Sequence, residues 1–495
     1  MKTITVCSKG SGDCLSISEA IEKALPYDLI RVTNGVYEES FSNLKPVAII
    51  GEGLETIIRP KGKIGFQVVE HLMLKSLLIQ GNGSSQQIIN NNNGRLSVID
   101  CCLEECHCAI MANGQDAILF LDNTIIRNCS DVGVRLNGGS KGIIQAAEFS
   151  SNKSAVIISD GSNPLIRKCR FRKNQVGTEL FSLGESVIQE SLYLENEYGI
   201  TISDGANPVI RRCDIERNNI GVVFEQTGLG ILEECHITSC NSGIYVSEGS
   251  NPILRTINIS DSFEYGLIFN GNANGLVQGC TIDNCYIGIL FTEKANPFIR
   301  HTQISNCNKY GLNAEKGSVG IVEECELFLC GKAGLYIETG SKTAIRHSRI
   351  HNNGIGCHVV NQGGAYLVGS QLTDNSIGVL IDKDSWFELV RSQVLHSEHQ
   401  GIVLQGKSSG LVERSYICSN LGSGLEALDG SQPVIRESSI SQNLGYAVSL
   451  ENNSKAVIIG SYLKRNSQNS LNISSASEVI SQNNETESVD QPIII

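Results

Sequence analysis

The segment NPVIRRC, residues 207–213, recurs through the chain with small changes. Close copies are NPLIRKC at 163–169, NPILRTI at 251–257 and NPFIRHT at 296–302, and a weaker copy is QPVIRES at 432–438. The steps from Pro164 to Pro208, Pro252 and Pro297 are 44, 44 and 45 residues. A fixed period of this kind indicates a repeat architecture, in which each unit buries its apolar face against its neighbours.

A second marker, a glycine followed by an apolar residue, shows that the structural period is half as long. Successive copies recur after about 22 residues, a period in the range of repeat proteins. They are Gly177, Gly199, Gly221, Gly243, Gly266, Gly288, Gly311, Gly334, Gly356, Gly378, Gly401 and Gly424. The apolar stretches between them are only two to four residues long, which is typical of short strands bounded by turns. The leucine-rich-repeat consensus is absent.

Three short strands in each of these periods predict an all-β fold, a right-handed parallel β-helix of about 20 coils. We assign residues 28–466 to this repeat domain. Residues 1–27 are expected to hold an N-terminal strand and a helix over 14–25 that caps the open end of the coils. Ser16 and Glu19 form a capping box for this helix. Its apolar face is Ile17, Ala20, Ile21, Ala24 and Leu25. Residues 467–495 are expected to form a polar tail.

The arginine of the repeated segment explains why that segment skips a coil. Residues one coil apart form a column in which arginine alternates with glutamine or glutamate over most of its length. The column is Gln145, Arg167, Gln189, Arg211, Glu233, Arg255, Gln278, Arg300, Glu323, Arg346, Val368, Arg391, Glu413 and Arg436. Equivalent residues on successive coils lie about 4.8 Å apart, where like charges repel. A building block of two coils therefore places unlike side chains next to each other, and a shift by one coil would bring like charges together.

Composition limits the partners. The net charge is −13, which argues against nucleic acid or an anionic membrane surface as the main partner. The N-terminus shows no secretory signal, and no apolar run is long enough to span a membrane. We therefore expect a cytoplasmic protein whose 18 cysteines are reduced thiols.

The cysteines fit a structural role better than a metal site. Cys285, Cys307 and Cys330 are one coil apart and should stack as a column, in a position that asparagines occupy earlier in the chain. Cysteine there is a small apolar filler. The segment CCLEECHC at 101–108 has no standard zinc-knuckle spacing. We predict no metal and no cofactor, and a metal or redox protein remains a minor alternative.

Two family resemblances follow from these motifs. The segment at 10–40, with NGVYEE at 34–39, and KPVAIIGEG at 45–53 resemble the first coils of pectinesterases and other pectin-lyase-like β-helix proteins. The coils at 140–440 resemble right-handed β-helix repeat proteins more closely. These include the substrate-recognition region of one group of F-box proteins and repeat proteins of the NosD type. The resemblance implies a fold and leaves the function open.

The enzymatic motifs of these families are absent. Neither the pectinesterase Gln-Asp-Thr, Asp-Phe-Ile-Phe-Gly and Gly-Arg-Pro-Trp segments, nor the polygalacturonase triplets, nor the alginate-epimerase Asp-Pro-His-Glu occur. No catalytic residue is therefore predicted. The favoured function is a non-catalytic, rigid binding module for a protein or carbohydrate partner. The alternative is a polysaccharide-active enzyme, a lyase, hydrolase or esterase, without recognisable motifs.

One stretch offers a candidate binding site. Trp386 is the only tryptophan, in the segment DKDSWFE at 382–388, which we interpret as a turn. Its neighbours one coil away are Gly364 and Ser408 or Ser409, which are too small to bury an indole. We therefore expect Trp386 and Phe387 to stand exposed, where they could stack on a sugar ring or anchor a protein. The acids beside them are Asp382, Asp384 and Glu388. The alternative is that Trp386 folds back over the side of the coils.

Overall fold

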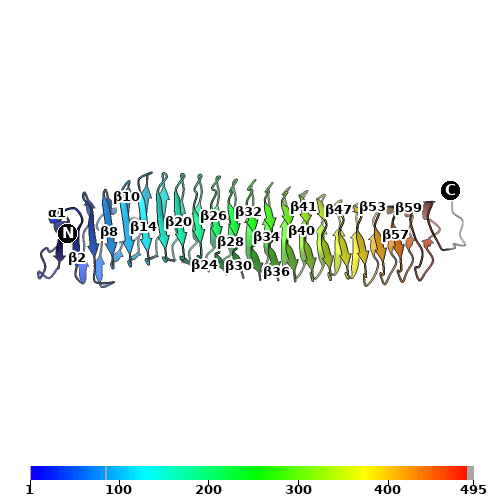
Figure 1. The fold of residues 1–495 in the computed structure, drawn as a ribbon, viewed down its shortest axis with the longest axis horizontal. Helices are drawn as coiled ribbons and strands as arrows, with labels where there is room; N and C mark the ends of the chain where they lie inside the picture. The colour runs from blue at the N-terminus through cyan, green and yellow to red at the C-terminus, as the bar shows by residue number, and fades with distance from the viewer. Residues whose placement is uncertain (1, 84–85, 488–495) are drawn as a thin grey trace. The chain divides into compact units, whose positions relative to one another are not determined.

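The computed structural model describes residues 2–83 and 86–487. It divides into two compact units, residues 1–241 and residues 242–495, and each is described by itself. In both units the chain coils through three parallel sheets, here called A, B and C, and each strand pairs with the equivalent strand of the next turn. Figure 1 shows the strands of each unit as successive parallel arrows.

The strands of the first unit are short. Sheet A contains β1 (Thr3–Val6), β2 (Asp28–Val32), β5 (Val47–Ile50), β8 (His71–Lys75), β11 (Arg95–Ile99), β14 (Ile118–Asp122), β17 (Lys141–Gln145), β20 (Asn163–Arg167), β23 (Val187–Gln189), β26 (Val209–Arg211) and β29 (Ile231–Glu233). Sheet B contains β3 (Gly35–Tyr37), β6 (Thr56–Ile58), β9 (Leu78–Gln80), β12 (Cys102–Glu104), β15 (Ile125–Arg127), β18 (Glu148–Ser150), β21 (Arg170–Arg172), β24 (Leu192–Leu194), β27 (Asp214–Glu216) and β30 (His236–Thr238). Sheet C contains β4 (Phe41–Asn43), β7 (Ile64–Val68), β10 (Gln87–Asn92), β13 (Cys108–Asn113), β16 (Val132–Asn137), β19 (Ser154–Ile158), β22 (Val176–Leu180), β25 (Tyr198–Ile202) and β28 (Ile220–Phe224).

The second unit repeats the same order. Sheet A contains β32 (Ile253–Arg255), β35 (Leu276–Gln278), β38 (Phe298–Arg300), β41 (Val319–Glu323), β44 (Lys342–Arg346), β47 (Gly364–Val368), β50 (Trp386–Val390), β53 (Ser409–Glu413), β56 (Gln432–Arg436), β59 (Lys455–Ile459) and β61 (Glu478–Gln482). Sheet B contains β33 (Asn258–Ser260), β36 (Thr281–Asp283), β39 (Gln303–Ser305), β42 (Glu326–Phe328), β45 (Arg349–His351), β48 (Gln371–Thr373), β51 (Gln393–Leu395), β54 (Tyr416–Cys418) and β57 (Ser439–Ser441). Sheet C contains β31 (Ser242–Val246), β34 (Tyr265–Phe269), β37 (Ile287–Phe291), β40 (Tyr310–Ala314), β43 (Ala333–Ile337), β46 (Ile355–Val359), β49 (Ile377–Ile381), β52 (Ile402–Leu404), β55 (Leu425–Ala427), β58 (Val448–Leu450) and β60 (Leu471–Ile473).

The predicted fold class is confirmed, with about 21 turns in the two units together. Alternation along each strand places one set of side chains inside the coil and the other outside. In sheet A of the first unit, Ile166, Ile188 and Ile210 pair in register and are fully buried. Stacked aliphatic side chains of this kind form a continuous core in each unit.

The corners between sheets are made by single residues in the left-handed backbone region. Lys168, Glu190 and Arg212, which follow the sheet A strands, have φ values of 54°, 51° and 51°. Equivalent residues after the sheet B strands, such as Lys173 and Glu195, have φ values of 53° and 56°. Non-glycine residues rarely adopt this conformation. One such residue turns the chain sharply, which lets each coil close within the short period of the repeat.

Polar residues stack inside the corner between sheets B and C, as predicted. In the first unit the column includes Asn152, Asn174, Asn196 and Asn218, which bond one another and the backbone. In the second unit Cys285, Cys307 and Cys330 occupy this column and are buried. Cys106 and Cys129 begin it in the first unit, with their sulfurs 3.4 Å apart. The column satisfies buried backbone groups that the bends leave free.

Within each unit the arginine column is confirmed except at one position. Arg167 donates to Gln145 at 2.6 and 3.0 Å, and Arg211 donates to Gln189 at 2.9 and 3.2 Å. In the second unit, however, Val368 pairs with Val390 and not with Arg391. Arg391 is the left-handed corner residue, with φ 50°. The sequence pattern placed the longer of two successive steps between Val368 and Arg391. In the structure the step from Val368 to Val390 is the shorter one, and the longer step runs from Val390 to Glu413, one turn later.

Both ends of the chain differ in detail from the prediction. The helix α1 spans Ile17–Lys23, shorter than 14–25, and lies at the N-terminal end of the first unit (Figure 1). Ser16 caps it as predicted, and Ile17, Ala20 and Ile21 are buried. Leu25 lies beyond the helix and is 68% exposed, so its assignment to the apolar face is wrong. At the other end, β60 and β61 add paired strands beyond residue 466, and residues 488–495 of the expected tail lie outside the described residues.

Candidate binding site

Trp386 begins strand β50 and does not lie in a turn, which corrects the sequence interpretation. Alternation along the strand directs Trp386 and Glu388 to the outer face of sheet A, and Phe387 to the interior. Phe387 is only 1% exposed, so the prediction that it stands free for a ligand is wrong. Trp386 is half-buried.

Gly364 was predicted correctly as one neighbour of Trp386, and of the two serines predicted for the other side it is Ser409 that pairs with it. Gly364 precedes it by one turn and Ser409 follows it. The indole lies over Gly364, and a Cβ atom at that position would collide with the six-membered part of the ring. The ring of Tyr366 meets Trp386 edge-on, with centroids 4.7 Å apart and planes at 71°. The indole therefore lies down on the sheet and forms an aromatic pair there.

A shallow hollow of about 390 Å³ opens beside Trp386 on the outer face of sheet A. Its lining comes from β50, β53 and β56: Trp386, Phe387, Glu388, Ser409, Gly410, Leu411, Gln432, Val434 and Arg436. Because Ser409, the residue paired with Trp386 on the next turn, is small, the surface is lower directly next to the indole. Glu388, Gln432 and Arg436 supply a carboxylate, an amide and a guanidinium to the same hollow.

The hollow continues toward the C-terminal strands. An adjoining space of about 410 Å³ shares Ser409, Gln432 and Val434, and it extends to Val457 and Ile480. Leu411, Val434, Val457 and Ile480 stand at paired positions on successive strands and form an apolar strip. Polar side chains, among them the Lys455–Glu478 ion pair at 3.1 Å, border this strip.

The three acids of the predicted site are separated by the structure. Glu388 lines the Trp386 hollow, two residues along the strand from the indole. Asp384 lies in the preceding turn and lines a different hollow of about 410 Å³, together with Asn361, Gln362 and Lys383. Asp382 is half-buried and lines neither. The predicted site therefore reduces to Trp386 and Glu388, to which Tyr366, Gln432 and Arg436 are added.

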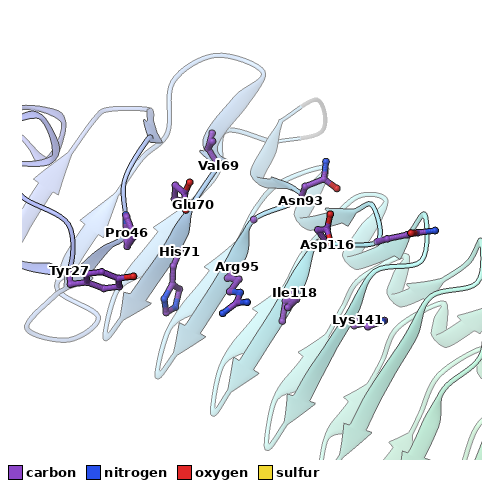
Figure 2. A pocket seen from close by; sticks show the side chains of 12 residues that line it. Tyr27, Pro46, Val69, Glu70, His71, Asn93, Arg95, Asp116, Ile118 and Lys141 are labelled. Atoms are coloured by element: carbon purple, nitrogen blue, oxygen red, sulfur yellow. The ribbon is translucent and has the colours of Figure 1, made fainter.

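A second surface, in the first unit, was missed by the sequence analysis. A hollow of about 620 Å³ lies over the first turns (Figure 2). Its lining is Tyr27, Pro46, Val69, Glu70, His71, Asn93, Gly94, Arg95, Gln115, Asp116, Ile118 and Lys141. His71, Arg95, Ile118 and Lys141 stand at paired positions on four successive sheet A strands. The signal that could have found it is this row, which places His71 next to Arg95 and only Ile118 between Arg95 and Lys141.

Metal-site and membrane-helix features are not found in the part of the chain that the structure describes. No group of three or more His, Cys, Asp or Glu side chains is placed to hold a metal ion there. None of its helices is long and apolar enough to cross a membrane. The cysteines are unpaired, and 17 of the 18 are buried. Burial raises the pKa of the Cys357 thiol to about 12, and that of Cys108 likewise to about 12.

The family comparison agrees with the architecture. The model of the right-handed β-helix region matches residues 79–228, 242–380 and 377–494. The chain therefore belongs to the right-handed β-helix family. A search of curated protein sequences gave no significant match.

Several solved structures of different kinds of protein have a chain path similar to that of this protein. The N-terminal fragment of bacteriophage Phi29 gene product 12 has a TM-score of 0.47 and 12% identity, over 87% of this chain and 89% of that one. The catalytic domain of a GH87 α-1,3-glucanase bound to nigerose has a TM-score of 0.40 and 14% identity, over 70% and 65%. Pectate lyase Pel9A has a TM-score of 0.33 and 13% identity, over 54% and 76%. Similarity at this level carries no argument about activity.

Proposed function

We propose that this chain is a non-catalytic binding protein, and that the Trp386 hollow holds a carbohydrate chain. The observation that supports the proposal is the half-buried Trp386, paired edge-on with Tyr366 and followed at once by an open hollow. Aromatic side chains that keep one face accessible provide a large apolar contact at little conformational cost. The face of a sugar ring is the kind of surface that such a platform accepts.

The shape and lining of the hollow favour a glycan over a folded protein. The space is shallow, and the strip that continues it crosses β50, β53, β56, β59 and β61, about 20 Å at the spacing of paired strands. Glu388, Gln432 and Arg436 provide both donors and acceptors for hydroxyl groups. An extended chain with alternating apolar faces and hydroxyl edges would match this strip over several turns.

Binding without catalysis is the better interpretation of the acids. Glycoside hydrolysis needs two carboxylates at a fixed separation across the scissile bond. Among the described residues, Glu388 is the only carboxylate that lines the Trp386 hollow, and Glu478 lines the adjoining space at its far side in an ion pair with Lys455. We therefore propose that the bound glycan is released unchanged.

A glycan array probed with the labelled full-length protein, followed by calorimetry on the best ligand, tests the proposal. Trp386→Ala should weaken binding at least tenfold. Tyr416→Ala is the matched control, because Tyr416 is 56% exposed on sheet B of the same unit. Tyr416→Ala should bind like the wild type.

Three outcomes would contradict the proposal. If Trp386→Ala binds the glycan with the affinity of the wild type, Trp386 does not contribute to the binding site. Cleavage of the ligand during incubation would make the protein an enzyme. Binding to no glycan, together with Trp386-dependent capture of a purified protein, would assign the hollow to a protein partner.

A further inference from the structure

An acidic residue interrupts an apolar row on the outer face of sheet A in the second unit. The row stands at paired positions on successive strands and consists of Ile253, Leu276, Phe298, Ile321, Ala344, Tyr366, Glu388, Leu411, Val434, Val457 and Ile480. Glu388 is its one charged member. The equivalent row of the first unit, from Leu29 to Ile231, has no charged member. The coil itself therefore does not require a charge at this position.

The Glu388 carboxylate has uncharged neighbours along and across the strands. Tyr366 and Leu411 stand beside it on the turns before and after. Trp386 and Val390 lie two residues away on its own strand, on the same face. Glu388 is half-buried, and among the described residues its carboxylate makes no hydrogen bond and no ion pair. Because a partly buried carboxylate without a partner is unfavourable, a leucine or valine would suit the row better. Departures of this kind from the local pattern are expected at functional sites.

The basic side chains of the two adjoining hollows have other neighbours. Arg436 lines the Trp386 hollow but stands two strands further on, which separates its backbone from that of Glu388 by roughly 10 Å. Its paired residue on the preceding turn is Glu413. Lys455 forms an ion pair with Glu478 at 3.1 Å. The Glu388 carboxylate is therefore available to a cation from outside the chain.

Aromatic rings border this carboxylate. The rings of Trp386 and Tyr366 meet edge-on, 4.7 Å apart, directly beside Glu388. A cation gains from the face of an aromatic ring, most of all from tryptophan. A carboxylate next to it adds a charge-assisted hydrogen bond. A protonated amine uses both interactions, whereas a neutral hydroxyl group uses only the hydrogen bond.

We propose that Glu388 recognises a protonated amino group, and that the ligand of the Trp386 hollow is a chain of amino sugars such as partly deacetylated chitin. This inference rests on the proposed function, because it names the class of glycan that the hollow accepts. The sugar ring lies against the indole, and its amine meets the carboxylate two residues along the strand. The net charge of −13 assists the approach of a cationic polymer.

A lysine-bearing peptide is a poorer match for this surface than an amino sugar. Strands β50 and β53 are paired on both sides, so their backbone groups are already used. A peptide therefore cannot add to the sheet as a further strand, the mode in which main-chain hydrogen bonds supply the affinity for an extended peptide. An amino sugar needs no such pairing, because side chains contact both its ring face and its amine.

Calorimetry at pH 5.5 on the full-length protein tests the proposal with three β-1,4-linked tetramers. They differ in one group of each ring: the glucosamine tetramer carries amines, the N-acetylglucosamine tetramer amides, and cellotetraose hydroxyls. Wild type should bind the glucosamine tetramer at least tenfold more tightly than either of the others. Glu388→Gln should bind it at least tenfold more weakly than wild type and should bind cellotetraose within twofold of wild type. Glu398→Gln is the matched control, because it removes an exposed charge of the same unit outside the hollow, and it should change each affinity less than twofold.

The melting temperature without sugar shows whether Glu388 is merely structural. Glu388→Leu restores the apolar row, so it should melt above the wild type while losing the preference for the amine. Melting below the wild type would make Glu388 a structural residue and overturn the proposal.

The binding data separate this proposal from the proposed function. If the three tetramers bind equally and Trp386→Ala weakens them all, the glycan site stands and the amine preference is refuted. If none of the tetramers binds, the amino-sugar proposal falls, and the glycan array alone decides the proposed function. If a tetralysine peptide binds in a Glu388-dependent way while no tetramer does, the carboxylate serves a protein partner and the proposal is overturned.

Discussion

Replacing Asn196 by alanine removes four hydrogen bonds from the interior of the first unit. The Asn196 amide nitrogen donates to the Phe171 carbonyl and to the Asn218 side chain, both at 3.0 Å. Its side-chain oxygen accepts from the backbone nitrogen of Asn174 at 2.9 Å and from the Asn174 side chain at 3.0 Å. Asn196 is 3% exposed, so water does not replace these partners.

The cost can be estimated from the group that is left alone. In Asn196→Ala the buried backbone nitrogen of Asn174 loses its acceptor, which costs about 1–3 kcal/mol. The lost donor bonds and the small cavity add roughly 1 kcal/mol. We expect a total loss of about 2–4 kcal/mol in the free energy of unfolding. Asn196→Cys should fall between alanine and wild type, because cysteine fills this column elsewhere but accepts hydrogen bonds weakly.

Urea unfolding followed by far-UV circular dichroism measures the effect, and hydrogen exchange at the Asn174 amide locates it. Asn219→Ala is the control: Asn219 is exposed and makes a single side-chain bond to Glu197 at 2.8 Å. It should cost about 0.5 kcal/mol or less. If Asn196→Ala unfolds at the urea concentration of Asn219→Ala, or if Asn174 exchange is unchanged, the column does not stabilise the coil as argued.

Three further predictions follow from particular contacts. Gly364→Ala should displace the indole of Trp386, shift its emission to longer wavelength and cost about 1–3 kcal/mol in urea unfolding, whereas unchanged emission would show that the indole does not rest on Gly364. Burial raises the pKa of Glu338, so the folded protein holds this proton to higher pH than the unfolded chain does. The free energy of unfolding should therefore fall as pH rises through that range. Glu338→Gln should stabilise the protein near pH 7 and should have no such effect near pH 3. The Ser11 hydroxyl lies 3.1 Å from the Cys7 sulfur and contributes most to lowering the pKa of Cys7 to about 6. Iodoacetamide at pH 7 should therefore label Cys7 well before Cys357, whose pKa is raised by burial, and peptide mass spectrometry measures both rates. Equal rates would contradict this prediction.

The repeat made most of the architecture predictable. Glycine recurs at an equivalent point of each coil and Asn-Pro at an equivalent point of every second coil, so counting residues placed Gly364 on one side of Trp386 and Ser408 or Ser409 on the other, and the structure has Ser409 there. The stacking of Cys285, Cys307 and Cys330 followed from the same count. Where one coil is a single residue longer than its neighbour, as around Arg391, the count can slip by one position and exchange a strand residue for a corner residue.

Other features could not be found in this way. In the first turns, the paired core positions follow one another at unequal intervals along the chain; they are Ile30, Ile49, Leu74 and Val98. Counting residues therefore did not align His71 with Arg95. The polar run before Trp386 suggested a turn, yet the strand begins at the tryptophan itself because Phe387 and Leu389 fill the core.

The emission of Trp386 during titration with the best glycan from the array is the most direct test of the proposed function. As the only tryptophan, it reports on this hollow without interference. The account predicts a saturable shift to shorter wavelength and protection from acrylamide quenching, with the same dissociation constant that calorimetry gives. If the glycan binds by calorimetry while the emission and the quenching of Trp386 stay unchanged, the glycan does not occupy the Trp386 hollow.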